Sequence, residues 1–287
     1  MRLPFLILTP VCVLLGLSVV IASQREVEGY LLVLTLLVAM FAHVSVNALN
    51  EYFDFSNGLD LKTLRTPFSG GSGALPQHPE MAVAVLILGL GSLLATVLLG
   101  AFFVWKYGAA VMPLGVAGLL LVAAYTPWIT KRPFLCLIGP GLGFGFLMVA
   151  GTHFAMTGEY STLSWQVAVV PFFLVNNLLL LNQYPDIHAD RSVGRNNILI
   201  AYGTQLGSVV YGVFATLAMA AIVLLAGSGI VPALSLIALL PMPLAFFALS
   251  GAVKYGEAIG NYPHFLLANV LVALLTPALL GVAIIFG

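Results

Sequence analysis

The sequence predicts an all-α protein that crosses a membrane many times and forms a single domain over residues 1–287. Hydrophobic residues make up 61% of the chain, charged residues make up 7%, and the mean hydropathy is +1.10. This composition is typical of polytopic helical membrane proteins and excludes a large soluble domain. The formal net charge is zero, so no basic surface indicates a nucleic-acid partner.

Long apolar runs divide the chain into predicted transmembrane helices. A helix of about 20 residues crosses a hydrocarbon core of about 30 Å. By this measure nine spans are expected, at 4–22, 30–50, 81–104, 108–128, 134–157, 165–182, 204–227, 230–250 and 264–286. The first run resembles a signal peptide, but it is long enough to span and lacks a clear cleavage site, so we expect a helix. The boundary at Lys106 and Tyr107, between the third and fourth runs, is the least defined.

Lys and Arg are unevenly divided between the two ends of these spans. If the N-terminus is cytoplasmic, eight lie on the cytoplasmic side, and only Arg25 and Lys106 lie on the other. The eight are Arg2, Lys62, Arg65, Lys131, Arg132, Arg191, Arg195 and Lys254. Because cytoplasmic loops carry an excess of Lys and Arg, the asymmetry predicts the orientation of a multi-pass protein of the cell (inner) membrane.

Two polar segments interrupt the apolar sequence and resemble each other. The first reads NEYFDFSNGLD over residues 50–60, and the second reads NQYPDIHAD over residues 182–190. Each contains N-x-x-x-D followed by another Asp, and together they hold five of the ten acidic residues. The two segments follow the second and sixth spans, which indicates an internal duplication of parallel topology and puts both on the cytoplasmic side.

Carboxylates at a membrane boundary are costly unless they are paired or bound to a cation, so the segments predict a functional site. Facing clusters of Asp favour a Mg²⁺-bound diphosphate, because magnesium prefers a few carboxylate oxygens together with phosphate oxygens. Helix capping by Asn and Asp is the alternative for one such motif. Two copies on one side, each followed by a further Asp and an Arg, favour cation binding instead. Glu51 is left as either a ligand or a solvated residue.

The spacing within each segment predicts how the side chains converge. On a helix, Asn182, Asp186 and Asp190 at i, i+4 and i+8 form one stripe, and Pro185 is expected to interrupt the sixth span beside it. Asn50 and Asp54 repeat the first half of that stripe in the second span. We expect Asp60 to return to the site from a turn, since Gly58 offers a helix stop.

Basic residues and a glycine-rich loop supply candidates for binding an anion. Glycines in the loop TPFSGGSG, residues 66–73, permit positive φ and a nest of backbone N–H groups. A mobile connector is the alternative, but Arg65 at the loop entrance favours phosphate. The predicted diphosphate-binding residues are Lys62, Arg65, Lys131, Arg191 and Arg195; Arg132 and Lys254 are assigned to the charge asymmetry alone.

Aromatic residues near the segments are candidates for a cavity wall and acceptor site. Tyr52, Tyr125 and Tyr184 could flank a cationic intermediate, because aromatic faces attract positive charge. Tyrosines of an interfacial belt are the alternative. His43 precedes Asn50 on the second span and is expected to face the cavity. Cys12 and Cys136 lie in apolar runs and are interpreted as buried packing residues.

At these residues the sequence resembles the UbiA superfamily of intramembrane prenyltransferases. NEYFDFSNGLD is similar to the first Asp-rich motif of that family, and NQYPDIHADRSVGR is similar to the second. The segment YTPWITK, residues 125–131, also agrees with the family. The six-residue spacing from Asp54 to Asp60 is similar to that of members that prenylate 1,4-dihydroxy-2-naphthoate in menaquinone synthesis.

The resemblance implies an all-α barrel of nine transmembrane helices around a central cavity, with Mg²⁺ as cofactor. It implies a prenyl diphosphate whose isoprenoid tail lies in the membrane cavity, and a small aromatic acceptor that attacks its first carbon. Asp54, Asp60, Asp186 and Asp190 would be the catalytic residues. One of two Mg²⁺ ions would be held by Asn50, Asp54 and Asp60, and the other by Asn182, Asp186 and Asp190.

Departures from the family pattern leave other acceptors open. Glu51 stands where naphthoate enzymes usually have Asp, and Asn197 stands where Thr is frequent. The alternative is a prenyltransferase of this type that acts on 4-hydroxybenzoate or a glycerol-phosphate lipid. More distant alternatives are a CDP-alcohol phosphotransferase, whose Asp residues form one compact motif, and a cation-coupled transporter, which would carry acids midway through its spans.

Overall fold

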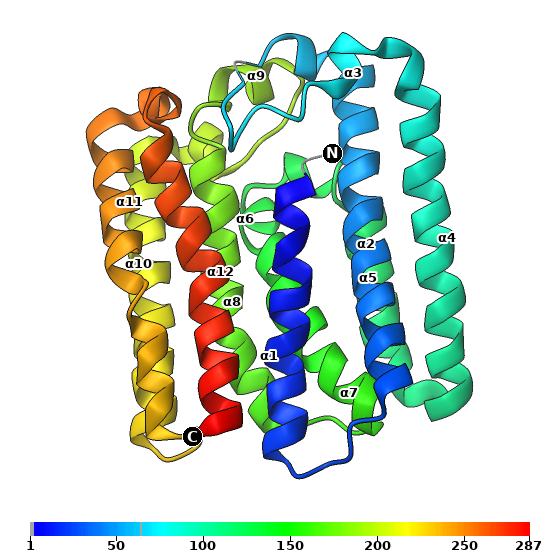
Figure 1. Ribbon diagram of the computed structural model, residues 1–287. Helices are drawn as coiled ribbons and strands as arrows, with labels where there is room; N and C mark the ends of the chain where they lie inside the picture. Colours follow the sequence, from blue (N-terminus) through cyan, green and yellow to red (C-terminus); the bar gives the residue numbers. More distant parts are fainter. Residues whose placement is uncertain (1–2, 64) are drawn as a thin grey trace.

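The structure is a computed structural model that describes residues 3–63 and 65–287, and its long helices run side by side as a bundle (Figure 1). The α-helices are α1 (Leu8–Ala22), α2 (Gly29–Ser56), α3 (Ala74–Gln77), α4 (Ala82–Tyr107), α5 (Met112–Ala124), α6 (Pro133–Gly141), α7 (Gly151–Thr157), α8 (Thr162–Asn182), α9 (Ile187–Ser192), α10 (Ile198–Gly227), α11 (Met242–Tyr255) and α12 (Pro263–Phe286). Shorter 3-10 segments are Leu3–Ile7, Leu59–Leu61, Pro79–Met81, Gly108–Val111, Ile129–Lys131, Ala233–Leu239 and Gly256–Asn261, and a π-helical segment covers Leu142–Ala150.

Eight stretches of the described chain are long and apolar enough to cross a membrane. The third stretch, Pro79–Ala124, contains two helices, because the chain turns at Gly108 and runs back from α4 into α5 (Figure 1). Gly108 has a φ of +68°, a left-handed conformation that side chains disfavour and that ends α4. Divided at Gly108, this stretch corresponds to the predicted spans 81–104 and 108–128, with α4 in the first and α5 in the second. The all-α, multi-pass fold class is confirmed.

The helix boundaries differ from the predictions where polar residues extend a helix or a proline disturbs it. Helix α2 continues beyond the predicted end at residue 50 as far as Ser56, so it carries the first part of the first polar segment, including Asn50 and Asp54. The predicted span 134–157 combines α6, the π-helical segment and α7, and Pro140 precedes the wide turns. The N–H of Gly141 donates to Asn176 Oδ1 of α8 at 2.6 Å. This bond gives a buried N–H a partner where the backbone hydrogen bonding changes from the α-helical to the π-helical pattern.

The packed core and the open interior lie on different sides of the bundle. Buried side chains of α1, α8, α10 and α12 form the largest apolar cluster, which includes Leu15, Leu174 and Ile222. On the other side, α2 packs against α4, and α5 together with the π-helical segment completes the wall of a cavity. Outward side chains such as Leu98 and Leu224 are exposed, as expected where lipid tails cover an apolar surface.

Both polar segments lie at the same end of the bundle, beside α3 and α9 (Figure 1). At the opposite end, Arg25 forms an ion pair of 2.6 Å with Glu159, and Lys106 donates to the Tyr30 hydroxyl at 3.1 Å. Arg2 lies outside the described residues. The other seven basic residues lie at the same end of the bundle as the two polar segments. The structure therefore divides the described Lys and Arg between the two ends as the sequence predicts.

Candidate active site

The first polar motif is placed by the last turns of α2 and the turn that follows them. Asn50 and Asp54 lie one helical turn apart on α2, and Asp54 is buried. Gly58, with a φ of +78°, reverses the chain into the 3-10 segment Leu59–Leu61. Asp60 is therefore buried beside the helix it follows, at 5% exposure, and the predicted return from a turn at Gly58 is correct.

The second polar motif is split by a break in the helix. Helix α8 ends at Asn182, the chain turns through residues 183–186, and α9 begins at Ile187. Pro185 lacks an N–H and lies in this turn, so the predicted interruption is correct. The prediction that Asn182, Asp186 and Asp190 form one helical stripe is wrong, because the interruption places Asp186 in the break between α8 and α9.

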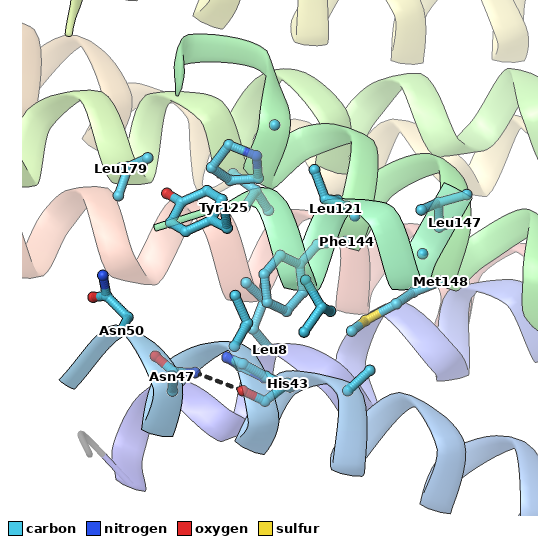
Figure 2. A pocket seen from close by; sticks show the side chains of 18 of the residues that line it. Leu8, His43, Asn47, Asn50, Leu121, Tyr125, Phe144, Leu147, Met148 and Leu179 are labelled. Carbon is cyan, nitrogen blue, oxygen red and sulfur yellow. Dashed lines mark hydrogen bonds between the residues drawn. The ribbon is translucent and has the colours of Figure 1, made fainter. Parts of the chain in front are cut away.

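One cavity of about 700 Å³ joins the two motifs to the apolar interior. Its polar end is lined by Asn50, Asp54, Asp60, Asn182, Asp186 and Asp190. From there it continues along α2, α4, α5 and the π-helical segment, past residues such as Leu121 and Met148. Figure 2 shows Asn47 and Asn50 on α2 facing Tyr125 across this space, while the His43 ring packs edge-on against Phe144.

Arg195 links the two motifs at the polar end of the cavity. Its Nη1 lies 3.0 Å from Asp190 Oδ1, and its Nη2 is hydrogen-bonded to Asp54 Oδ1. Asn197 donates to the other oxygen of Asp190 at 3.2 Å. Burial raises the pKa of the Asp190 carboxyl, and the neighbouring Arg195 opposes that shift. Carboxylates of α2 and α9 therefore share one guanidinium.

The glycine-rich loop closes over the same carboxylates. The Gly70 N–H donates to Asp186 Oδ2 at 3.0 Å, and the Ser72 hydroxyl donates to Glu51. Gly70 and Gly71 have φ values of +78° and +69°, and a Cβ on Gly71 would lie 2.6 Å from Asp60 Oδ1. Only glycine fits this approach without strain. The loop thus supplies backbone and hydroxyl donors to an anionic cluster.

The donor atoms of the cluster fit a magnesium ion. Asp60 Oδ2 and Asn182 Oδ1 are buried and have no hydrogen-bond partner among the described residues, although buried polar atoms normally have one. The pKa of Asp60 is raised to about 7, first by burial and then by repulsion from the nearby Asp54 and Glu51 carboxylates. A divalent cation would relieve this repulsion, and carboxylate and amide oxygens are ligands that Mg²⁺ accepts.

The protein alone does not complete such a site with charged or sulfur ligands. In residues 3–63 and 65–287, no group of three or more His, Cys, Asp or Glu side chains is arranged to hold a metal ion. Magnesium typically takes one or two carboxylates and completes its shell with water and substrate phosphate.

Comparison with known proteins identifies the family. A model of the UbiA prenyltransferase family matches residues 9–270. This chain belongs to that family.

Two curated relatives of known name are similar in sequence to this chain. The chain is 27% identical over 194 residues to the 1,4-dihydroxy-2-naphthoate octaprenyltransferase of Bacillus subtilis (strain 168), a region that covers 67% of this chain and 60% of that protein. It is 24% identical over 208 residues to the protein of the same name from Haemophilus influenzae, which covers 69% of this chain and 65% of the relative. The matched regions thus span less than two thirds of either relative.

The two structures show the fold. An apo structure of a UbiA homolog from Aeropyrum pernix K1 superposes with a TM-score of 0.72 at 16% identity, over 98% of each chain. A UbiA homolog from Archaeoglobus fulgidus bound to DMAPP and Mg²⁺ superposes with a TM-score of 0.66 at 17% identity, again over 98% of each chain. The predicted family and its helical architecture are therefore confirmed.

Of the five basic residues expected to bind diphosphate in this UbiA-family chain, Arg195 lines the cavity. Lys62 is exposed, and its Nζ lies 3.4 Å from Ser192 Oγ. This contact connects the chain just after the first polar segment to the chain just after the second, outside the cavity wall. Arg65 is exposed and its guanidinium packs against Gly73. Lys131 and Arg191 are also exposed and lie outside the wall. For these four residues, diphosphate binding stays a prediction.

The aromatic candidates divide into two groups. Tyr125 and His43 line the cavity, and His43 Nδ1 lies 2.7 Å from Thr9 Oγ1. Tyr184 does not: it is completely buried, and its hydroxyl is 2.9 Å from Ser208 Oγ of α10. The break after α8 turns this side chain toward α10, so the prediction of a cavity residue is wrong. Tyr52 is also absent from the wall, and its ring packs edge-on against Phe53.

The structure adds polar residues that the sequence did not single out. Asn47 lines the cavity three residues before Asn50, a helical spacing that could have revealed it. Thr126 accepts a hydrogen bond from Asn50 Nδ2 at 3.1 Å, but it lies on another segment and no local pattern marks it. Gln183 lines the cavity and its amide lies 3.3 Å from Cys136 Sγ. Of these three residues, Thr126 contacts a motif side chain directly and helps to orient Asn50.

Proposed function

We propose that this UbiA-family protein transfers a prenyl group from a prenyl diphosphate to a small aromatic acceptor, with Mg²⁺ as cofactor. The observation that carries the proposal is one cavity of about 700 Å³ with both Asn/Asp motifs at its polar end and an apolar interior between membrane-spanning helices. A diphosphate requires the first environment and an isoprenoid tail requires the second. Binding of DMAPP and Mg²⁺ by the Archaeoglobus fulgidus homolog supports the same pairing.

The side chains at the polar end would bind the substrate diphosphate through cations and hydrogen-bond donors. Two Mg²⁺ ions would be held by Asn50, Asp54 and Asp60, and by Asn182, Asp186 and Asp190. When bound, the ions neutralise charge on the leaving diphosphate as the allylic C–O bond breaks. Arg195 and the N–H groups of the glycine-rich loop orient the phosphate oxygens and donate to them.

The apolar wall protects the reacting carbon. Side chains such as Leu121 and Phe144 exclude water, which would otherwise capture the allylic cation. Tyr125, beside the polar end, offers an aromatic face to that cation. The electron-rich ring of the acceptor then forms a bond to the first prenyl carbon, and its ring proton leaves to restore aromaticity.

We infer that the acceptor is 1,4-dihydroxy-2-naphthoate or a related quinone precursor, because both curated relatives carry that name. An enzyme of the same type with 4-hydroxybenzoate or a glycerol-phosphate lipid as acceptor is the alternative. The protein would act in the cell (inner) membrane, with the polar end of the cavity facing the cytoplasm.

Product analysis tests the proposal directly. Purified protein is incubated with MgCl₂, prenyl diphosphates of several lengths and each acceptor, and the products are identified by mass spectrometry. We expect prenylated naphthoate, and no product when EDTA replaces MgCl₂. Folded protein that prenylates none of the acceptors in the presence of Mg²⁺ would contradict the proposal, and a product from another acceptor would revise the naphthoate inference alone.

Gly118→Phe is expected to shorten the prenyl chain that the enzyme accepts. Gly118 lines the cavity on α5, and the nearest atom to a Cβ there is Leu147 Cδ1 at 4.0 Å, so a larger side chain would extend into the space for the tail. Misfit in an apolar pocket costs roughly 10- to 200-fold in specificity. We expect kcat/KM to fall by at least about tenfold for octaprenyl diphosphate and less for dimethylallyl diphosphate.

The control for this substitution is Gly91→Phe, because Gly91 is exposed on α4 and is not part of the cavity wall. It is expected to leave the ratio of long-chain to short-chain activity at the wild-type value. An equal loss for both chain lengths in Gly118→Phe would show that the tail does not reach α5.

Arg65→Ala is expected to raise the KM for prenyl diphosphate more than the KM for the acceptor, because the proposed partner of its guanidinium is phosphate. Steady-state kinetics with each substrate varied in turn measures both constants. Arg132→Ala is the matched control, since Arg132 is exposed and lies over the Trp128 ring at 5.9 Å. A selective rise in the KM for the acceptor would reassign the loop to the acceptor side.

A further inference from the structure

Arg195 occupies an unusual position for a surface-loop arginine. It belongs to the short connection between α9 and α10, yet its side chain is only 17% exposed and lines the cavity. One guanidinium nitrogen is bonded to Asp54 from α2, and the other lies 3.0 Å from Asp190 on α9. The guanidinium therefore lies between the two motifs that are proposed to hold the cations.

The surrounding contacts fix the arginine there. The Arg195 N–H donates to the Asp190 carbonyl at 3.1 Å, and Gly194, at a φ of +80°, reverses the chain just before it. Asn197 caps α10 by accepting from the Ile200 N–H at 3.0 Å while it donates to Asp190. A planar guanidinium with fixed N–H groups suits a bridge between two carboxylates better than an ammonium does.

Charge balance explains why a cation is required at this place. Buried carboxylates that face each other repel strongly unless positive charge lies between them, and arginine stays protonated in proteins. Removing one member of a buried charge network leaves the other charges uncompensated, which is strongly destabilising. Arg195 thus supplies, from within the chain, positive charge that the facing carboxylates need.

We propose that Arg195 is an internal counter-ion that holds the two motifs together and exchanges its carboxylate partners for phosphate oxygens when Mg²⁺ and a diphosphate bind together. The inference rests on the proposed function and concerns the order of binding. Mg²⁺ alone would have to displace Arg195 and leave its charge without a partner. A diphosphate alone would meet uncompensated carboxylates. Together they satisfy the acids and the arginine, so their binding is synergistic.

The test uses the purified full-length protein with MgCl₂ and inorganic pyrophosphate as probes, and it measures thermal unfolding and Mg²⁺ titrations without turnover. For the wild type we expect small shifts in Tm with either probe alone and a large shift with both. The apparent affinity for Mg²⁺ should be at least about tenfold tighter in the presence of pyrophosphate.

Arg195→Gln should reverse this pattern. We expect it to lower the Tm in EDTA, to bind Mg²⁺ alone at least about tenfold more tightly than the wild type, and to lose most of the synergy with pyrophosphate. Arg132→Gln removes the same charge from the exposed surface at the same end and is expected to behave as the wild type does. If Arg195→Gln binds Mg²⁺ alone no more tightly than the wild type, the inference is overturned.

A double variant keeps the test decisive if the single variant does not fold. Asp54→Asn/Arg195→Gln removes one negative and one positive charge, so we expect it to purify and to unfold in EDTA within a few degrees of the wild type. A double variant that fails to fold would also overturn the inference. The wild type separates the two proposals: absence of any combined effect of Mg²⁺ and pyrophosphate would count against the proposed function itself.

Discussion

Asp186→Asn is expected to lower the rate of prenyl transfer by about 10²-fold or more while the protein stays inserted and folded. The Gly70 N–H donates to Asp186 Oδ2 at 3.0 Å, and an asparagine oxygen in the same place can accept that bond. The substitution therefore removes the negative charge and preserves the shape of the loop. Turnover at saturating prenyl diphosphate, measured across a Mg²⁺ titration, checks the effect.

Asp54→Asn should produce a loss of similar size, but it also weakens the contact with Arg195, so Asp186→Asn is the cleaner variant. Glu80→Gln is the control, because Glu80 is an exposed acid that lies 3.3 Å from His78 and outside the cavity wall. It should keep wild-type turnover. Near wild-type turnover of either Asp variant at saturating Mg²⁺ would rule out the assignment of that residue to a metal.

The fold could be predicted because its determinants are local in the sequence. Each span is a run of apolar residues, and the bilayer leaves few alternatives to a helix for such a run. The turn that brings Asp60 back to the cavity was also predictable, since Gly58 adopts a left-handed conformation that most residues avoid. Pro185 marked the end of a helix for a similarly local reason.

What the sequence did not reveal depends on contacts between distant segments. Arg195 and Asp54 are 141 residues apart, and no spacing rule relates them. Tyr184 lies between two site residues in the sequence, yet the break after α8 directs it toward Ser208. A helical stripe was the simplest expectation for the second motif, and the turn at residues 183–186 replaced it with a bend that still brings Asp186 and Asp190 to one cavity.

Cysteine labelling is expected to place both polar motifs on the cytoplasmic side. Ser56 and Ser192 are exposed beside the first and second motifs, and Ser228 is exposed where α10 ends, at the opposite end of the bundle. A membrane-impermeant maleimide should label Ser56→Cys and Ser192→Cys only in inverted vesicles, and Ser228→Cys only in right-side-out vesicles. The native Cys12 and Cys136 are 0% and 2% exposed and should stay silent.

The orientation rests on the Lys and Arg asymmetry, which normally determines which loops stay in the cytoplasm. If all three positions labelled from the reverse sides, the helical arrangement would stand and only the cytoplasmic assignment would fall. Labelling of Ser56→Cys and Ser192→Cys from opposite sides has a larger consequence. The two Asn/Asp motifs could not then face one cavity, no single diphosphate could contact both, and the prenyltransferase proposal would fail together with the arrangement of the helices.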